Sequence, residues 1–571
     1  MQTSQINKTK YSVFKFFSWF ISLFIIFTLI GCGGGSSGGE NAHNATLNAQ
    51  IPTIAIQPIN AAYAVGEQAN ALSVTAEVAD GGMLSYQWYK SSVGTVEDGI
   101  EISGETSNAY TPSTSVSGTF FYYVVVTNTQ VNGNKTASII SNIVKVDVGY
   151  VIHFYDNDLN LNQSIVVSLG NVDLLQLIAD YGLPTSLFET NSSTDISSYT
   201  DYNITSDINL YATKNVQEIR NEVELNNVRN NLSGKYILLS DITLTNTTLD
   251  ETEGWLPTGD YYDDDDFSYT FTGILNGNNH TISGLWIDRP LTSYIGLFGA
   301  IYNAQVKNLE VEINNSNGGV RGYNFVGGIA GGVLGSNISN SYSTGDIGGD
   351  SGIGGIAGYI GGSNVSNSYS TGNISGNYGV GGIAGYISES DIASSYSKGD
   401  INGDDYVGGI AGGIDYSNVS NSYSTGYISG NSGVGGIVGY ISESNVSNSY
   451  SAGNISGNYS IGGIVGVAMN DGVVVQNNAA INPLIDGASD ANRIFGYNYS
   501  STASNNFALE TMLVNGNTVS GGDNLNGEGK SEADLKTKST YESLGWSFGD
   551  NNANPWKIDE NSSYPYLYWQ R

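Results

Sequence analysis

The sequence predicts an all-β protein dominated by a parallel β-solenoid, and three observations support this fold class. The GGI[AV]G core of one recurring phrase begins every 27 residues, at Gly327, Gly354, Gly381, Gly408, Gly435 and Gly462. The phrase S-Y-S follows in the same register, with Tyr342, Tyr369, Tyr396, Tyr423 and Tyr450 at its centre. The 571 residues include 75 Gly and 39 Tyr, a composition typical of turn-rich β-structure. Because the period is fixed, we expect one stacked coil per copy.

Within one 27-residue coil, the pattern predicts two strands joined by corners. In the copy that begins at Val380 the strands are Val380–Ile387 and Ile392–Gly399, roughly 25 Å long each. The apolar ladders of the core are expected at Ile356, Ile383, Ile410 and Ile437 and at Val365, Ile392, Val419 and Val446. We expect recurring glycines to close the segments with φ > 0, at positions 345, 372, 399, 426 and 453 and at 349, 376, 403, 430 and 457.

Two further ladders have a predicted structural role. Stacked amides are expected to hydrogen-bond along Asn337, Asn364, Asp391, Asn418 and Asn445, where Asp391 removes one donor. The tyrosine series invites a glycan-stacking interpretation, because sugars pack on aromatic faces. We favour a tyrosine stack that stabilises the coil, since every copy has it and a binding site is usually local.

Function is therefore expected where the copies differ. These corner positions are the candidate ligand-facing residues. They are Asp346, Asn373, Asp400, Tyr427 and Asn454, together with Ser351, Tyr378, Asp405, Ser432 and Tyr459.

The N-terminus predicts export and membrane anchoring. Lys8, Lys10 and Lys15 precede the apolar run Phe16–Ile30, which is typical of a signal peptide over residues 1–31. The tetrad Leu-Ile-Gly-Cys that ends at Cys32 resembles the bacterial lipobox, which implies lipidation of Cys32. By the same resemblance, Gly33 in place of Asp favours the outer membrane, and we expect a cell-surface location. Residues 32–50 are expected to form a flexible tether.

Two small modules are predicted to follow the tether. Residues 51–148 show short alternating strands and resemble a bacterial immunoglobulin-like β-sandwich, with Trp88 as the core tryptophan and Val124 in the usual cysteine place. Residues 150–214 have the order β-β-α-β and resemble small β-grasp-like surface repeats. We interpret both modules as spacers.

The rest of the chain is predicted to cap and build the solenoid. Residues 215–325 should hold a helix over Asn215–Leu232, with Asn215 and Glu218 as a capping box, and then irregular capping coils. Residues 326–466 hold the repeats, and 467–571 hold the last coils and an aromatic plug over the open end. The region Asn215–Arg571 resembles surface proteins with the GLUG motif, some of which are adhesins.

Charge and acidic clusters restrict the partners. The formal net charge of −33 argues against nucleic acid as a partner, because a polyanion would be repelled. Four consecutive acids, Asp263–Asp266, leave open a weak calcium site at Asp263 and Asp265. A solvated acidic loop is the favoured interpretation, since neighbouring side chains alternate in direction. No other cofactor is predicted.

The sequence lacks a complete catalytic motif of the two enzyme classes that its repeats bring to mind. The zinc-protease motif H-E-x-x-H, which some GLUG-bearing proteases need, is missing from a chain with only His43, His153 and His280. Carboxylates of the kind used by β-helix polysaccharide-degrading enzymes occur at Asp400, Asp404 and Asp405, but the preceding coil has Asn373, Asn377 and Tyr378 there. We therefore predict a non-enzymatic protein.

The sequence as a whole predicts a lipid-anchored surface protein whose solenoid serves adhesion or ligand binding. The membrane would be held through Cys32, and the ligand would be an extracellular glycan or protein. Two alternatives stay open, a structural or periplasmic scaffold without its own ligand and a β-helix polysaccharide-degrading enzyme.

Overall fold

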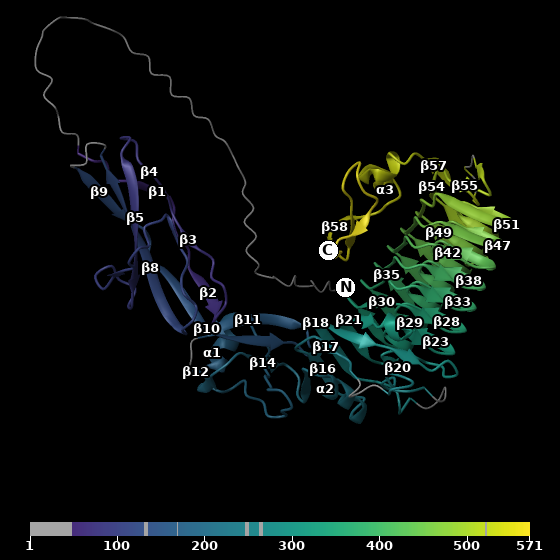
Figure 1. Ribbon diagram of the computed structural model, residues 1–571, viewed down its shortest axis with the longest axis horizontal. Helices are drawn as coiled ribbons and strands as arrows, with labels where there is room; N and C mark the ends of the chain where they lie inside the picture. The colour runs from purple at the N-terminus through teal and green to yellow at the C-terminus, as the bar shows by residue number, and fades with distance from the viewer. Residues whose placement is uncertain are drawn as a thin grey trace, which may run out of the picture. The chain divides into compact units, whose positions relative to one another are not determined.

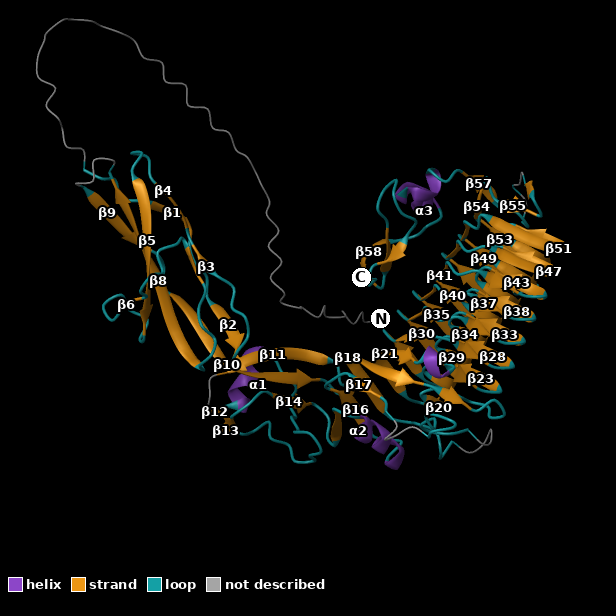
Figure 2. Cartoon of the chain, in the orientation of Figure 1, coloured by secondary structure: helices purple, strands orange, loops and turns teal. Residues whose placement is uncertain are grey.

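The computed structural model describes residues 48–130, 135–167, 170–245, 250–261, 267–519, 522 and 524–570. The chain divides into two compact units, the first up to Glu189 with Thr194–Thr213 and the second comprising Thr190–Ser193 and the residues from Lys214 onward. Strands predominate in both (Figure 2), and the described α-helices are short: α1 (Leu174–Tyr181), α2 (Glu222–Asn226) and α3 (Lys538–Ser543). The predicted all-β class is confirmed.

The first unit begins with one larger sheet and two smaller strand pairs, and its core holds a buried tryptophan. One sheet pairs β5 with β6 and β8, and β8 in turn with β9 and β10; smaller pairs are β1 with β4 and β3 with β7. Trp88 and Val124 are fully buried register partners on β5 and β8, in agreement with the core roles expected of them. The strands are β1 (Thr53–Ile56), β2 (Ala61–Ala64), β3 (Leu72–Ser73), β4 (Thr75–Glu77), β5 (Met83–Ser91), β6 (Ile100–Glu101), β7 (Ala109–Tyr110), β8 (Gly118–Thr129), β9 (Thr136–Ile140) and β10 (Val144–Tyr155).

Strand β10 is continuous across the two predicted small modules. Its first half pairs with β2 and β8, whereas its second half pairs antiparallel with β11 and parallel with β14. The predicted boundary at 148–150 therefore falls inside one strand, which couples the two modules through backbone hydrogen bonds. The remaining strands are β11 (Leu161–Val167), β12 (Gly170–Val172), β13 (Tyr202–Ile204) and β14 (Ile208–Tyr211).

The helix predicted over Asn215–Leu232 is wrong in its first part. Residues Val216–Ile219 form β15, which pairs in parallel with β16 (Lys235–Leu238), because the β-branched residues at both ends of β15 are buried in the sheet. The short helix α2 begins later, and its N-cap is Asn221, whose side chain accepts a hydrogen bond from the Glu224 backbone N–H at 3.0 Å. A 3₁₀ turn, η1 (Asn227–Asn230), follows it.

The second unit is the predicted solenoid, in which three parallel sheets run along the stack of coils (Figure 1). We call them the first, second and third faces. The third face is the simplest, with eight strands in sequence order. They are β20 (Phe298–Tyr302), β24 (Ala330–Leu334), β29 (Ala357–Gly361), β34 (Ala384–Ser388), β39 (Ala411–Asp415), β44 (Val438–Ser442), β48 (Val465–Ala468) and β52 (Phe495–Asn498).

The first face carries the asparagine and tyrosine ladders. After the irregular strands β17 (Ile242–Thr243), β18 (Ile274–Leu285) and β21 (Gln305–Ile313), each coil contributes two short strands to it. These are β25 (Asn337–Ser339), β26 (Tyr342–Thr344), β30 (Asn364–Ser366), β31 (Tyr369–Ser370), β35 (Asp391–Ala393), β36 (Tyr396–Ser397), β40 (Asn418–Ser420), β41 (Tyr423–Ser424), β45 (Asn445–Ser447) and β46 (Tyr450–Ser451).

The second face also takes two strands from each coil. Its strands include β22 (Val320–Arg321), β23 (Asn324–Gly327), β27 (Ile347–Gly348), β28 (Ser351–Gly354), β32 (Ile374–Ser375), β33 (Tyr378–Gly381), β37 (Ile401–Asn402), β38 (Asp405–Gly408), β42 (Ile428–Ser429), β43 (Ser432–Gly435) and β47 (Ile455–Gly462). The second and third faces meet at the GGI[AV]G phrase, so this phrase marks a corner of every coil.

The two eight-residue strands predicted for each coil are wrong, because the structure breaks each of them. Val380–Ile387 is split between β33 and β34 at Gly382, where a Cβ atom would lie 2.2 Å from the Gly409 carbonyl oxygen. Ile392–Gly399 is split between β35 and β36 at Ser394, whose φ is 51°. Each coil is therefore a three-sided turn of five short strands.

The apolar ladders predicted for the interior are all buried. Ile356, Ile383, Ile410 and Ile437 have no exposed surface, and neither do Val365, Ile392, Val419 and Val446. A third ladder runs through Ile347, Ile374, Ile401, Ile428 and Ile455. Because like residues stack in register, one aliphatic core runs through the coils.

The recurring glycines are needed mainly because the backbones of neighbouring coils approach closely there. The prediction that they provide a left-handed backbone is wrong. Of the ten predicted positions only Gly345 has a positive φ, at 102°. At Gly372 a Cβ atom would lie 1.6 Å from the Gly345 carbonyl oxygen, and at Gly399 it would lie 1.8 Å from that of Gly372. These glycines form a ladder of their own, in which the backbones pack without side chains between them.

This packing predicts that Gly382→Ala strongly destabilises the solenoid. The new methyl group would meet backbone of the next coil, which cannot move without breaking the register, and we expect a loss of about 3 kcal/mol or more, at or beyond the upper end for overpacking. Gly348→Ala is the matched control, since its nearest neighbour is the Ser375 hydroxyl at 3.2 Å. Urea unfolding of both variants measures the difference, and equal stabilities would contradict this account of the corner.

Candidate functional site

The tyrosine ladder on the first face is a continuous ring stack. Consecutive ring centroids from Tyr342 to Tyr450 lie 4.2, 4.8, 5.0 and 4.8 Å apart, and the planes are within 21° of parallel. The stack results directly from the coil register, because each tyrosine is the Cα partner of its copy in the next coil.

The aromatic C-terminal segment covers this stack, so the predicted plug over the open end of the solenoid is wrong. Trp569 stacks on Tyr342, Tyr369 and Tyr396 with centroid distances of 5.9, 6.3 and 5.5 Å. Trp556 lies 6.0 Å from Tyr450. The segment therefore runs back along the side of the coils, where the stacked rings offer more apolar surface than the last coil alone.

Hydrogen bonds fix the segment to the ladder. The Tyr450 hydroxyl donates to the Pro565 carbonyl oxygen at 2.9 Å, and the Trp546 indole N–H donates to the Asn477 carbonyl oxygen at 2.7 Å. Burial raises the pKa of the Tyr450 hydroxyl well above its usual range. Since Tyr396, Tyr423 and Tyr450 are only 6, 3 and 4% exposed, the ladder is a structural seam closed by the chain itself.

The first set of variable positions forms a polar ladder along one corner. The side-chain oxygens of Asp346, Asn373 and Asp400 each accept a hydrogen bond from the backbone N–H one coil further on, at 3.3, 3.2 and 2.9 Å. Tyr427 and Asn454 continue the row, and both are exposed. These oxygens link adjacent coils, which gives the ladder a structural role on an accessible corner.

The asparagine ladder behaves as predicted. Asn364 donates to Asn337 at 3.1 Å, and Asn418 and Asn445 donate to the residue one coil earlier at 2.7 Å. Asp391 accepts from Asn418 but has no amide with which to donate to Asn364, so the aspartate removes one donor at that step.

The second set of variable positions lies beside aromatic rings that the sequence analysis missed. Tyr378 is 43% exposed, and its ring centroid lies 5.0 Å from that of Tyr406 and 6.2 Å from that of Tyr386. Asp405 and Ser432 follow Tyr378 in the same register row, and Tyr459 closes it with 55% exposure. The structure thus brings Tyr378 and Asp405 next to a second group of aromatic side chains, along the corner between the second and third faces.

Two grooves complete the set of candidate sites. A groove of about 250 Å³ on the second face is lined by Arg321, Asp346, Asn373 and Ser375 among others. Asp346 is the one carboxylate in that lining, whereas acid-base cleavage of a glycan uses two carboxyl groups.

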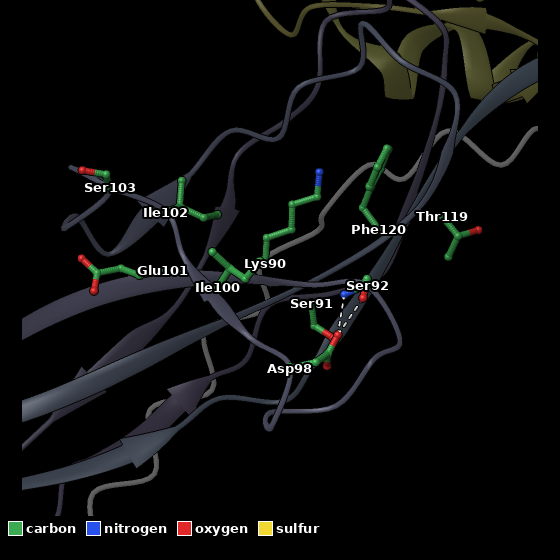
Figure 3. Close-up of a pocket in the computed structure, with 10 residues that line it drawn as sticks. All are labelled: Lys90, Ser91, Ser92, Asp98, Ile100, Glu101, Ile102, Ser103, Thr119 and Phe120. Carbon is green, nitrogen blue, oxygen red and sulfur yellow. Dashed lines mark hydrogen bonds between the residues drawn. The ribbon is translucent and has the colours of Figure 1, made fainter.

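A larger cleft, of about 620 Å³, lies on the first unit beside Lys90 and Phe120 (Figure 3). The Lys90 ammonium group sits 4.0 Å from the centre of the Phe120 ring. Asp98, at its rim, accepts from the Ser91 hydroxyl at 2.7 Å and from the Ser92 backbone N–H at 2.9 Å. These hydrogen bonds, that of Ser91 first, lower the pKa of the Asp98 carboxyl. Asp98 therefore serves to hold the loop that forms the rim.

Three of the predicted site residues, Cys32, Asp263 and Asp265, lie outside the described residues. Within the described part of the chain, no group of three or more His, Cys, Asp or Glu side chains is placed to hold a metal ion. No helix in that same part has the length and hydropathy needed to cross a bilayer.

Comparison with known proteins gives two partial relatives, and no family model matches the chain. The first is a Gly-rich membrane protein of Evansella cellulosilytica, 41% identical over 90 residues, or 15% of this chain and 10% of that protein. The second is halomucin of Haloquadratum walsbyi, 38% identical over 109 residues, or 19% of this chain and 1% of that protein. The chain thus spans a tenth or less of the length of either relative.

Among solved structures, an IgA1 protease matches over 74% of this chain and 28% of its own, with a TM-score of 0.33 and 18% identity. The pectate lyase Pel3 of Pectobacterium carotovorum matches with a TM-score of 0.11 and 9% identity. Likenesses at this level carry no argument about function.

The closed seam predicts that Trp569→Ala opens the tyrosine ladder. Loss of the indole removes three ring contacts, and we expect a destabilisation of about 2 kcal/mol, less than for a fully buried tryptophan. Thermal unfolding and the rate of tyrosine nitration both report it, and nitration of Tyr369 and Tyr396 should accelerate. Tyr499→Ala, at a 71% exposed ring, is the control. Unchanged nitration in Trp569→Ala would show that the segment does not cover the ladder.

Proposed function

We propose that the chain is a non-enzymatic, lipid-anchored protein of the bacterial cell surface, whose solenoid presents an elongated ligand-binding face in adhesion. One observation carries the proposal: the repeated residues of each coil are occupied by the core, the glycine ladder, the amide ladder and the closed tyrosine seam. What is left on the surface is the set of positions where the copies differ.

The exposed surface of the repeats has an unusual composition. From Val320 to Ala468, a stretch that the structure describes in full, every large apolar side chain that is exposed is a tyrosine. These are Tyr323, Tyr378, Tyr416, Tyr427 and Tyr459. Tyrosine combines a large contact area with a hydroxyl group, which suits a surface that must stay hydrated and still bind.

The anchor and the resemblance to GLUG-motif proteins support the same proposal. In this proposal the lipobox-like sequence at Cys32 provides a lipid attachment point before the tether, and the two small modules act as a spacer between anchor and coils. The partial likeness to a membrane protein and to halomucin is compatible with a surface location.

A labelling experiment on whole cells tests the anchor. In cells that produce the full chain, Cys32→Ser should abolish incorporation of labelled palmitate and release the protein from the membrane fraction, because the acylated cysteine is the attachment point. Ser36→Ala, in the same tether, is the matched control and should leave both unchanged. Palmitate incorporation that persists in Cys32→Ser would exclude the anchor.

A second measurement tests the surface location. Protease added to intact cells should remove the repeat region, and permeabilised cells provide the control that the repeats are cleavable at all. Repeats that survive on intact cells but are cut after permeabilisation would exclude the adhesion proposal and favour a periplasmic scaffold.

A further inference from the structure

A second aromatic series runs along the corner between the second and third faces. Two positions in each coil point to this corner, one just before the GGI[AV]G phrase and one just after it. In six successive coils one of the two is aromatic and the other is Gly or Ala: Tyr294 and Ala300, Phe325 and Gly332, Gly352 and Tyr359, Gly379 and Tyr386, Tyr406 and Gly413, Gly433 and Tyr440. We call these six rings the corner stripe.

The rings of the corner stripe are in contact along much of its length. Centroids of Tyr294 and Phe325 lie 5.0 Å apart, and those of Phe325 and Tyr359 lie 5.7 Å apart. Tyr406 and Tyr440 are separated by 4.9 Å. The small residues give the rings their room, since a Cβ atom at Gly379 would lie 2.1 Å from the Tyr386 ring and one at Gly433 would lie 2.8 Å from the Tyr406 ring.

Three of the six rings stand at positions whose backbone favours glycine. The first position of the pair is left-handed in every coil, with φ of 60° at Tyr294, 56° at Phe325 and 57° at Tyr406. A non-glycine residue there costs about 1–2 kcal/mol, and the coils beside Tyr406 avoid that cost with Gly379 and Gly433. Residues held in such a conformation are concentrated at functional sites.

Unlike the tyrosine ladder of the first face, the corner stripe is open. Its rings are partly exposed, and Tyr378, which is 43% exposed, extends it outward between Tyr386 and Tyr406. The C-terminal segment contacts the tyrosines of the first face. A row of polar side chains with one residue per coil flanks the stripe, formed by Ser351, Tyr378, Asp405, Ser432 and Tyr459.

We propose that the corner stripe binds an extended, uncharged polysaccharide chain, with sugar rings packed on the aromatic side chains and sugar hydroxyls bonded to the flanking row. The proposal rests on the function proposed above and adds the site and the ligand class. Coils stacked about 4.8 Å apart each add one aromatic ring to the stripe and one residue to the flanking row, which suits a polymer with a repeating unit of comparable length.

Charge and composition argue for this ligand over others. The net charge of −33 repels polyanions, and the cations between Val320 and Ala468 are Arg321 and Lys398 alone. Aliphatic anchors are missing from the exposed surface of that fully described stretch, and tyrosine supplies all of its exposed large apolar side chains. Tyrosine rings with neighbouring hydroxyl and carboxylate groups are the polar and apolar mixture that a sugar requires.

The repeats themselves supply the test variants. Tyr378→Ser introduces the residue found at the same position in other copies, Ser351 and Ser432. Tyr406→Gly likewise introduces the residue of Gly379 and Gly433. Because other coils carry these residues, the coil should keep its fold. Tyr416→Gly is the matched control, because Tyr416 is 63% exposed, has a left-handed backbone and corresponds to Gly335 and Gly362, but lies on a different corner.

Affinity electrophoresis and calorimetry of the full chain would use hydroxyethyl cellulose, galactomannan and laminarin, with alginate as the polyanion. We expect binding to at least one of the uncharged polysaccharides, and about a tenfold or greater loss of affinity in the Tyr378→Ser, Tyr406→Gly double variant. Tyr416→Gly should bind like the wild type, and alginate should not bind. If the double variant melts at a lower temperature than the wild type, the affinity of the single variant Tyr378→Ser tests the site instead. The Tyr378 ring lies largely outside the core, so its loss should not affect folding.

Each contrary result has a separate meaning. Polysaccharide binding that survives in the double variant overturns the corner stripe as the site. A wild-type chain that binds none of the uncharged polysaccharides, or binds alginate best, overturns the ligand class. Binding to a matrix protein that depends on Tyr378 while no polysaccharide binds also overturns it, in favour of a protein partner. The proposed surface function stands or falls separately, on the palmitate and protease experiments.

Discussion

The coil-to-coil register is the constraint on which the rest of the solenoid depends. Parallel strands 27 residues apart place each residue over its own copy, so a single choice of residue is repeated along the whole stack. Isoleucine and valine become continuous cores, asparagine becomes an amide ladder, and glycine becomes a line of close backbone contacts. The copies agree closely at these positions and vary at the corners.

The same register produces two aromatic series, one covered by the C-terminal segment and one partly exposed. The tyrosines of the first face stack face to face and bind the tryptophans of the C-terminal segment, so they contribute to stability. The corner stripe stays partly exposed, and its rings come from either of two positions while the other position is small. The C-terminal segment covers the regular stack and buries Tyr396, Tyr423 and Tyr450, whereas the less regular stripe keeps aromatic surface exposed, where we propose that a polysaccharide binds.

The first unit is built on a different principle. Strand β10 belongs to the sheets of both small modules, and Trp88 and Val124 are fully buried in the core of the first. A strand shared by two modules transmits orientation better than a flexible linker, because its backbone hydrogen bonds continue across the junction. This arrangement is compatible with the spacer role that we propose for the two modules.

The repeats in the sequence were sufficient to predict the solenoid, its period and its core. The spacing of identical phrases is a one-dimensional signal, and it was enough to place Ile383, Val365 and Asn418 on their ladders. The lengths of the strands, the course of the C-terminal segment and the position of the corner stripe became visible in the three-dimensional structure alone. Some of those features depend on contacts between residues far apart in sequence, such as that of Trp569 with Tyr369. Others depend on pairs such as Gly379 and Tyr386, in which the ring needs the space that the glycine leaves, and this relation is visible only in three dimensions. The periodicity shows which residues the copies have in common. It does not show which surface of the coils the C-terminal segment covers.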